Sequence, residues 1–377
     1  MENPGQENAT EDPLIDLLNA TLNKSGASNQ TTDFSNLDFY VNVLITLKSY
    51  VFPTMIILGV AGNTLSFLVA IKPSNRKIST CIFMASLAVV DSGVLLDLLA
   101  YIVFIEWNVG EGVINRVMVH RVTYYLVEFL GQLSGWILAG MTIDRFIAIR
   151  FPLKAFTFCT VKRARKVVFG LTLVIGTVNA NILFTYQVKR DPVFGLERFV
   201  EDFPAAPVVE KIVSWWELIA GTVVPFFVLI IFNCLIIWNV RSASKFQRQM
   251  TYDQKDKMQA LRKAKAEAHL TRMLLLVCIA YLVCSVPVRI YLLENTGSFN
   301  YQDPEWFIQF NVGYWYGCIG WYMNYAINFY LYCIAGGRKF RQDVLEILCC
   351  GRRRQLKRNS EGLSEEGSMK IHVSTIA

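Results

Sequence analysis

The stretch Ile143-Asp144-Arg145-Phe146, which continues as Ile147-Ala148-Ile149-Arg150-Phe151-Pro152-Leu153, ends a long apolar segment with an acid-base pair and a basic turn. An arginine whose charge stays unpaired in hydrocarbon costs about 2.5–3.5 kcal/mol on insertion scales. Asp144 is the nearest carboxylate, so we expect Arg145 to pair with it. The stretch indicates a helix that leaves the hydrocarbon of a membrane at this pair.

The composition is that of a membrane protein. Of the 377 residues, 53% are hydrophobic and only 18% are charged, and the mean hydropathy is +0.35, which makes the chain more apolar than an ordinary soluble domain. The net charge of +7 does not indicate a nucleic-acid partner, because the basic residues lie between apolar runs. None of the nine cysteines lies in the amino-terminal tail or in a predicted external loop, so we expect no external disulfide framework.

Apolar segments divide the chain, and each is near or above the roughly 20 residues that cross a bilayer as a helix. They lie at about 46–71, 79–105, 117–150, 162–186, 211–240, 267–293 and 305–334. The last segment is the weakest by hydropathy because asparagines and glycines interrupt it, and we expect these polar groups to face the bundle rather than lipid. The segments predict an all-α membrane protein in which residues 46–335 form a seven-transmembrane helix bundle.

The amino-terminal residues 1–45 are polar and acidic, which predicts a disordered tail. The tail carries four Asn-X-Ser/Thr sequons, which indicate glycosylation outside the cell, at Asn8, Asn19, Asn23 and Asn29. Most of the 37 Lys and Arg residues follow the first, third, fifth and seventh segments, which the positive-inside rule assigns to the cytoplasm. Both signals predict a plasma-membrane protein with its amino terminus outside and its carboxyl terminus in the cytoplasm.

Residues 336–350 follow the seventh segment and predict a short amphipathic helix on the membrane surface, because their apolar residues are spaced for one face. Cys349 and Cys350 at its end, beside three arginines, indicate palmitoylation, with unmodified thiols as the alternative. Residues 351–377 are polar and predict a disordered cytoplasmic tail.

Several polar side chains lie where the predicted helices cross the bilayer, and they are Asn63, Asp91, Ser134, Asn324 and Asn328. An isolated carboxylate or amide there is costly unless its neighbours satisfy it. We therefore expect these side chains to form one shared polar core.

Two prolines interrupt predicted helices, and each removes a backbone hydrogen bond and kinks its helix. Pro225 lies in the fifth segment, and Pro287 ends the motif Cys284-Ser285-Val286-Pro287 of the sixth. Glu267 precedes Pro287 by a distance of about 30 Å along a helix, which puts it at the cytoplasmic end. The seventh segment closes with Asn328-Phe329-Tyr330-Leu331-Tyr332, in which Asn328 and Tyr332 share one face.

These motifs occur in the order found in rhodopsin-like (class A) G-protein-coupled receptors, which the chain resembles over about residues 46–350. Asp144-Arg145-Phe146 resembles the Asp-Arg-Tyr box that closes the third helix of that family, with Phe146 in the tyrosine place. The sixth segment resembles Cys-Trp-X-Pro with Ser285 in the tryptophan place. The seventh resembles Asn-Pro-X-X-Tyr with Phe329 in the proline place.

Other family features are missing, so the resemblance is to a divergent member. The family usually joins a cysteine at the outer end of the third segment to one in the second external loop. Here His120 holds the first position and residues 187–210 contain no cysteine, so that disulfide is absent. Thr172 or a neighbour stands where the fourth segment usually has tryptophan.

The resemblance implies a switch in which Asp144 and Glu267 hold Arg145 in a closed state; for Glu267, a solvated residue at a helix start is the alternative. Pro225 and Pro287 act as pivots in this scheme, and Asn328 and Tyr332 belong to the switch. The resemblance also implies that the polar core around Asp91 is a water-filled cluster that binds sodium, and a hydrogen-bonded knot between helices without an ion is the alternative. We expect no other cofactor and no metal site.

The outer half of the predicted bundle excludes two ligand classes. Monoamine receptors carry an aspartate at the place of Val127, and opsins carry a lysine at the place of Tyr322. The charged and aromatic side chains there suit a peptide or another polar ligand, and they are Tyr101, Glu128, Gln132, Glu217, Arg289, Trp321 and Tyr322. For Arg289, an internal salt bridge with Glu128 or Glu217 is the alternative, and for the aromatic residues it is an interfacial anchor.

The sequence thus predicts a non-enzymatic receptor that passes the binding of an extracellular ligand, in our first interpretation a neuropeptide, to heterotrimeric G proteins by outward movement of the sixth helix. Arrestin and membrane lipid are further expected partners. A chemosensory or orphan receptor for a non-peptide polar ligand is the alternative. An ion-coupled transporter that uses Asp91 is less favoured because the chain shows no internal repeat. An intramembrane hydrolase is disfavoured because His120, His269 and His372 lie at segment ends or in the tail.

Overall fold

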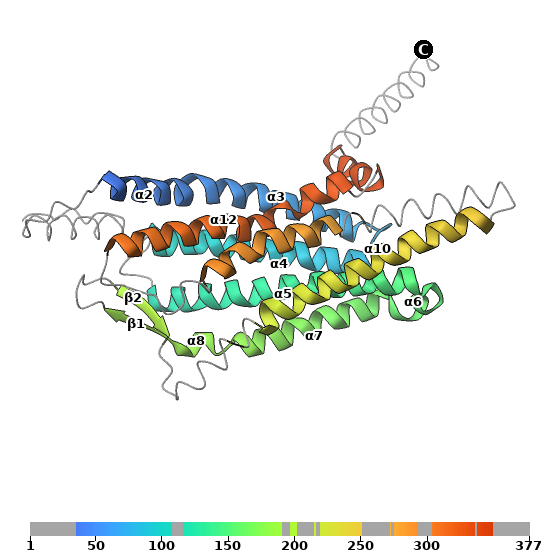
Figure 1. Ribbon diagram of the computed structural model, residues 1–377, viewed down its shortest axis with the longest axis horizontal. Helices are drawn as coiled ribbons and strands as arrows, with labels where there is room; N and C mark the ends of the chain where they lie inside the picture. The colour runs from blue at the N-terminus through green and yellow to red at the C-terminus, as the bar shows by residue number, and fades with distance from the viewer. Residues whose placement is uncertain are drawn as a thin grey trace, which may run out of the picture.

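The computed structural model describes the long helices of the chain and one pair of strands. The described residues are 35–107, 116–190, 197–201, 215, 219–250, 272, 275–292, 304–335 and 338–349. The long helices run side by side, with their axes close to one direction (Figure 1).

Three of the long helices contain a π-helical turn. The first helix runs from α2 (Ser35–Thr46) through η1 (Leu47–Val51) into α3 (Phe52–Ile71). The second runs from α4 (Ser79–Tyr101) into η2 (Ile102–Glu106), and in the fifth η3 (Ile219–Val223) precedes α10 (Val224–Met250). Such turns often mark functional positions in a helix.

The other helices complete the bundle. They are α5 (Arg116–Arg150), α6 (Pro152–Phe158), α7 (Val161–Asn179), α8 (Ile182–Thr185), a helix at 275–292, α12 (Pro304–Ala335) and a last helix at 338–349. α5 contacts α4, α7 and α10, and α12 contacts α3 and α4.

A short hairpin caps one end of the bundle. Its strands β1 (Tyr186–Arg190) and β2 (Glu197–Glu201) pair antiparallel, with Val188 opposite Phe199. The hairpin lies at the end opposite to α6 and helix 338–349 (Figure 1).

The predicted all-α helix bundle is confirmed. Within the described residues, six helices are long and apolar enough to cross a membrane, and they lie at Phe39–Ile71, Ser79–Ile105, Val117–Arg150, Val161–Phe184, Ile219–Asn239 and Leu275–Leu292. α12 is a further helix of 32 residues with the asparagines and glycines that weaken its hydropathy. Two features differ from the expectation: the first helix begins at Ser35 rather than near residue 46, and the hairpin was not predicted.

Two clusters of buried apolar side chains fill the bundle. One joins α4, α5, α10 and helix 275–292 around Ile137 and Leu229. The other joins the first helix, α4 and α12 around Phe52 and Leu95. Most of the apolar side chains on α7 face outward, as expected for a helix in contact with lipid.

α3 and α12 approach each other closely because α3 has glycine at the contact. A Cβ on Gly59 would lie 2.9 Å from the Cα of Ala326, and a Cβ on Gly62 would lie 2.9 Å from the Cβ of Phe329. A larger residue at either position would separate the two helices, whose contact places Asn63 beside α12.

Candidate switch, polar core and ligand pocket

Asp144 and Arg145, the acid-base pair at the end of α5, form an ion pair with each other. The guanidinium of Arg145 lies 2.9 Å from Oδ2 of Asp144, and both side chains are largely buried. The same carboxylate oxygen accepts hydrogen bonds from the hydroxyls of Ser79 at 2.9 Å and Thr80 at 3.2 Å. Asp144 is therefore fixed by the first turn of α4, and it fixes Arg145 in turn.

Two further contacts attach this pair to its surroundings. The thiol of Cys159, after α6, donates to the carbonyl oxygen of Asp144 at 3.3 Å. Burial and the neighbouring Asp144 raise the pKa of this thiol to about 11, so it keeps its proton at neutral pH. Phe146 meets the ring of Phe232 on α10, with centroids 5.2 Å apart, in an edge-to-face contact. The segment after α5 and helix α10 are thus both joined to the pair.

The structure brings three of the predicted polar-core residues into direct contact. Asp91 is fully buried, and its two carboxylate oxygens accept from the hydroxyl of Ser134 and the amide of Asn328, each at 2.7 Å. Asn63 donates to the carbonyl oxygen of Tyr325 at 3.0 Å, so it bonds to the backbone of α12. Asn324 is buried one turn before Asn328 on α12.

The polar core has acceptor capacity left over. The side-chain oxygens of Asn63 and Asn328 are buried, and neither has a hydrogen-bond partner among the described residues. The hydroxyl of Tyr332, one turn further along α12, is also buried and has no hydrogen-bond partner among the described residues. Its ring meets Phe340 of helix 338–349 at a centroid distance of 5.8 Å, which joins α12 to that last helix.

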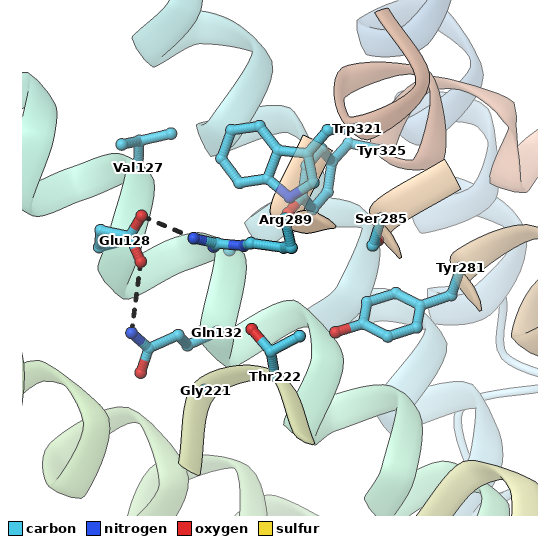
Figure 2. A pocket seen from close by; sticks show the side chains of 11 residues that line it. Val127, Glu128, Gln132, Gly221, Thr222, Tyr281, Ser285, Arg289, Trp321 and Tyr325 are labelled. Atoms are coloured by element: carbon cyan, nitrogen blue, oxygen red, sulfur yellow. Dashed lines mark hydrogen bonds and ion pairs between the residues drawn. The ribbon is translucent and has the colours of Figure 1, made fainter. Parts of the chain in front are cut away.

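A polar pocket lies between α5, η3, helix 275–292 and α12 (Figure 2). Arg289 approaches Glu128 at 3.7 Å, and the amide of Gln132 donates to the other oxygen of Glu128 at 3.5 Å. Gln132 and Asn179 also exchange a pair of hydrogen bonds of 3.1 and 3.2 Å. The remaining space is about 10 Å³, close to the ~10–15 Å³ that one water molecule needs.

Ser285 and Tyr281 supply two hydroxyl groups to this pocket from helix 275–292, and Figure 2 shows the Tyr281 hydroxyl beside Thr222. The oxygen of Ser285 is buried and has no partner in the described part of the chain. The ring hydroxyl of Tyr281 also reaches Gly135 of α5, where an added Cβ would lie 2.7 Å away. A tyrosine fits there because α5 has no side chain at that position.

The predicted ligand residues fall into two groups. Glu128, Gln132, Arg289 and Trp321 line the polar pocket, and Arg289 forms the internal pair with Glu128 that the sequence left as an alternative. Tyr101 and Tyr322 belong instead to an aromatic cluster, in which Tyr101 meets Trp315 at 6.0 Å and Tyr322 meets Phe52 at 5.8 Å. The described residues do not include Glu217.

Sequence reasoning missed Asp97 and Asn179. Asp97 is only 6% exposed, and one of its carboxylate oxygens has no hydrogen-bond partner within the described ranges. Its signal in the sequence is a second carboxylate in the apolar segment that contains Asp91. Asn179 is the last residue of α7 and follows an apolar run. In the sequence, a polar residue at this position could equally be a helix cap, so its hydrogen bond with Gln132 could not be predicted.

A second ionic cluster fixes helix 338–349 against the loop after α3. Lys72 lies 2.5 Å from Asp343 and 2.6 Å from Glu346, and Asn75 donates to Asp343 at 3.0 Å. Burial pushes the pKa of Asp343 upward, but the hydrogen bonds from Lys72 and Asn75 outweigh it and hold the pKa below its ordinary value. The bonds to Asp343 and Glu346 raise the pKa of Lys72.

The same end of the molecule exposes apolar side chains. On α6, Leu153 is 86% exposed and Phe156 is 84% exposed. The sulfur-bearing Cys349 is exposed at the end of helix 338–349. Other predicted positions lie outside the described residues, namely Asn8, Asn19, Asn23, Asn29, Glu267 and Cys350.

Comparison with known proteins identifies similar chains. Residues 62–328 match the model of a family described as "7 transmembrane receptor (rhodopsin family)". The KiSS-1 receptor of Mus musculus is 22% identical over 322 residues, which cover 84% of this chain and 78% of that protein. The somatostatin receptor type 2 of Mus musculus is 22% identical over 342 residues, covering 88% and 84%. The thyrotropin-releasing hormone receptor of Homo sapiens is 26% identical over 320 residues, covering 78% and 75%.

Proposed function

Because the chain belongs to the rhodopsin family of seven-transmembrane receptors, we propose that it is a plasma-membrane receptor that passes the binding of an extracellular peptide to heterotrimeric G proteins. Members of this family are receptors and not enzymes. The relatives named for KiSS-1, somatostatin and thyrotropin-releasing hormone are peptide receptors, which supports a peptide as the ligand. The observation that carries the proposal is the Asp144–Arg145 pair, buried and held by α4 at the end where the basic loops gather.

The proposed orientation puts the sequon-bearing amino terminus outside the cell and the basic loops in the cytoplasm. The polar pocket then lies in the outer half of the bundle, because Glu128 precedes Arg145 by about 25 Å along α5. This depth fits a site that a ligand reaches from outside, while Arg145 faces the cytoplasmic partner.

In the pocket, the ligand competes with a charge pair that the receptor already contains. Glu128 and Arg289 join α5 to helix 275–292, and the space beside them holds about one water molecule. A peptide group that takes Arg289 or Glu128 as its own partner opens this pair. A ligand shifts the equilibrium only by its difference in affinity for the two states, and separation of the pair supplies such a difference.

At the other end, the outward movement of helix 275–292 frees Arg145 for the G protein. Pro287 interrupts the backbone hydrogen bonds of that helix near Arg289, so the inner part can pivot when the outer part moves. In this proposal Glu267 is the second partner of Arg145 in the closed state, and Pro225, Asn328 and Tyr332 belong to the moving core.

Sodium is the proposed ion of the polar core. The donor set fits a hard cation with oxygen ligands: one carboxylate from Asp91, the hydroxyl of Ser134, and the two amide oxygens of Asn63 and Asn328 that have no partner within the described part. The ion supplies positive charge to a buried carboxylate. The same residues form a hydrogen-bonded knot between helices when the ion is absent.

The cytoplasmic face is the proposed contact for the G protein, and arrestin would use the same opening. Leu153 and Phe156 are exposed apolar residues beside basic loops, a combination that marks a protein interface rather than a solvated surface. In this proposal helix 338–349 lies on the membrane, with its exposed Leu345 and Leu348 in lipid and palmitate on Cys349 or Cys350.

A screen of peptides on cells that express the full chain, read by G-protein dissociation, tests the proposal. The expected result is a peptide that triggers dissociation with the wild-type chain and fails with Arg145→Ala at equal surface expression. Activation only by a small polar molecule would show the non-peptide alternative. Uptake of an ion-coupled solute by purified protein in liposomes, without nucleotide exchange, would contradict receptor signalling.

A further inference from the structure

A second cavity, of about 200 Å³, lies between α5, α7 and η3. Its walls include Trp136 of α5, Ala220 of η3, and Leu171, Val174 and Val178 of α7. It shares only Gln132 with the polar pocket, so the two cavities lie against the same side chain. Nothing in the proposed signalling mechanism uses this lateral cavity.

The mouth of the lateral cavity faces the bilayer. Val174 is 60% exposed and Val178 is 38% exposed, and both lie on α7, a helix that is long and apolar enough to cross the membrane. Gln132 and Trp136 precede Arg145 by about 20 and 14 Å along α5, and the hydrocarbon core is about 30 Å thick. The cavity therefore opens to lipid at the middle of the membrane and somewhat above it.

The lining is chemically suited to a hydrocarbon group. The indole N–H of Trp136 already donates to the carbonyl oxygen of Ala220 at 2.9 Å, and the amide of Gln132 is bonded to Asn179 at 3.1 Å. The other walls are aliphatic. A polar occupant would find no unsatisfied partner among these described groups and would lose its hydration, whereas an apolar one loses nothing.

We propose that the lateral cavity binds one acyl chain of a phospholipid from the surrounding bilayer. Its volume exceeds the ~150 Å³ of an apolar cavity that holds benzene, so it admits a length of flexible acyl chain. Acyl chains fill the space outside Val174 at bilayer concentration, so the occupant needs no access path through the protein. The chain rests on Trp136 and Gln132, and it supports the wall behind which Glu128 and Arg289 pair.

Quenching of tryptophan fluorescence tests this site in the full-length protein. The receptor is placed in phosphatidylcholine nanodiscs whose lipid carries bromine in the middle of one acyl chain, because bromine quenches an indole only on contact. The chain has eight tryptophans, so the fluorescence of each protein is compared with that of the same protein carrying Trp136→Phe. The difference between the two fluorescence signals is the contribution of Trp136. We expect the half-buried Trp136 to be quenched in the wild-type background.

Two variants on α7 distinguish quenching by a chain inside the cavity from quenching by general contact with lipid. Val174→Phe fills the mouth, and Leu173→Phe adds the same ring one residue away, at a side chain that is 54% exposed and does not line the cavity. The Trp136 quenching is lost in Val174→Phe and kept in Leu173→Phe. No Trp136 quenching in the wild type, or equal quenching in both variants, overturns the proposal.

Adding cholesterol to the nanodiscs distinguishes a phospholipid acyl chain from a sterol as the occupant of the cavity. If cholesterol removes the Trp136 quenching at constant brominated lipid, the occupant is a sterol and the acyl-chain assignment is wrong. Neither result depends on a peptide ligand or a G protein, so failure of this site leaves the proposed receptor function untouched.

Discussion

At the scale of single residues, the proposed closed state rests on a few hydrogen bonds to charged groups. Asp144 accepts from Ser79, Thr80 and Arg145 with one oxygen, and Glu128 accepts from Gln132 and meets Arg289. Hydrogen bonds to charged groups contribute about 1.5–3 kcal/mol each, so loss of one shifts a two-state equilibrium by about tenfold or more. Individual substitutions at these positions are therefore expected to have measurable effects on signalling.

Loosening Asp144 is expected to raise basal signalling. In Ser79→Ala/Thr80→Val, Asp144 loses both hydroxyl donors from α4 and can no longer fix Arg145, so basal nucleotide exchange rises by about tenfold or more. Ser92→Ala is the matched control, because the Ser92 hydroxyl bonds to Ala88 of its own helix at 2.8 Å. Basal exchange equal in wild type and double variant would contradict the role given to these hydroxyls.

Breaking the pocket pair is expected to destabilise the protein, and reversing it to restore part of the loss. Glu128→Ala leaves Arg289 without its carboxylate; since Arg289 is 31% exposed and the pair is 3.7 Å apart, we expect about 1–3 kcal/mol. The swap Glu128→Arg/Arg289→Glu recovers stability, measured as the midpoint of thermal unfolding. A swap that is as unstable as the sum of its single variants would show that the pair is not coupled.

At the scale of elements, helix 338–349 is attached from two sides. Phe340 meets Tyr332 of α12, and Asp343 joins Lys72 and Asn75 in the loop after α3. The first contact is apolar and the second is ionic, so only the second responds to pH. The last helix is therefore a part of the bundle whose ionic attachment depends mainly on the Asp343 carboxylate and the Lys72 ammonium group.

The attachment of helix 338–349 has a defined pH dependence. The folded pKa of Asp343 lies below its ordinary value, so its stabilisation is present above an unfolded pKa of about 3.9 and is lost as pH falls through the folded pKa. The folded pKa of Lys72 is raised, so its contribution is present below about 10.4 and is lost as pH rises through the folded pKa. The cluster thus stabilises over a wide neutral window.

Asp343→Asn measures this contribution. At neutral pH the variant is expected to unfold at a lower temperature than wild type, by the equivalent of about 1–3 kcal/mol for charge-assisted bonds, and the difference shrinks as pH falls toward 3. Glu346→Gln is the control, because Glu346 is 61% exposed and its pair with Lys72 is screened by water. A difference that stays constant with pH would show that the loss is not electrostatic.

At the scale of the whole molecule, the polar core is the place where hydrogen bonds join three of the helices. Asp91 of α4, Ser134 of α5 and Asn328 of α12 meet there, between the polar pocket and the Asp144–Arg145 pair. In the proposed switch, movement of helix 275–292 reaches Arg145 through this layer. The sodium ion proposed for this layer would hold three helices together and would therefore favour the closed bundle.

Sodium is expected to lower basal nucleotide exchange through Asp91. Replacement of sodium by choline at constant ionic strength raises basal exchange in wild type and has no effect in Asp91→Asn, which lacks the anionic ligand. Asp97→Asn removes another buried carboxylate of α4 and keeps the sodium response. If wild type is indifferent to sodium, the core is a hydrogen-bonded knot without an ion.

The sequence by itself determined the class of fold and the Asp144–Arg145 pair. A bilayer leaves no water for backbone groups, so long apolar segments must become helices whatever else the chain does. Asp144 and Arg145 are neighbours in the chain, so their pairing needs no knowledge of the fold. The polar core was also predictable as a group, because each of its members is costly when isolated in the membrane.

Only the tertiary structure decided which groups meet across helices. The rotation of each helix and the choice of its neighbours are set by the fit of many side chains, such as Gly59 and Gly62 against α12, and a hydropathy pattern does not contain this information. For this reason, only the structure could show that Arg289 pairs with Glu128. For the same reason, only the structure could show that Tyr101 and Tyr322 lie in an aromatic cluster and not in the predicted pocket. Lys72 and Asp343 are 271 residues apart, and the lateral cavity beside Trp136 exists only because α7 and η3 both lie against α5.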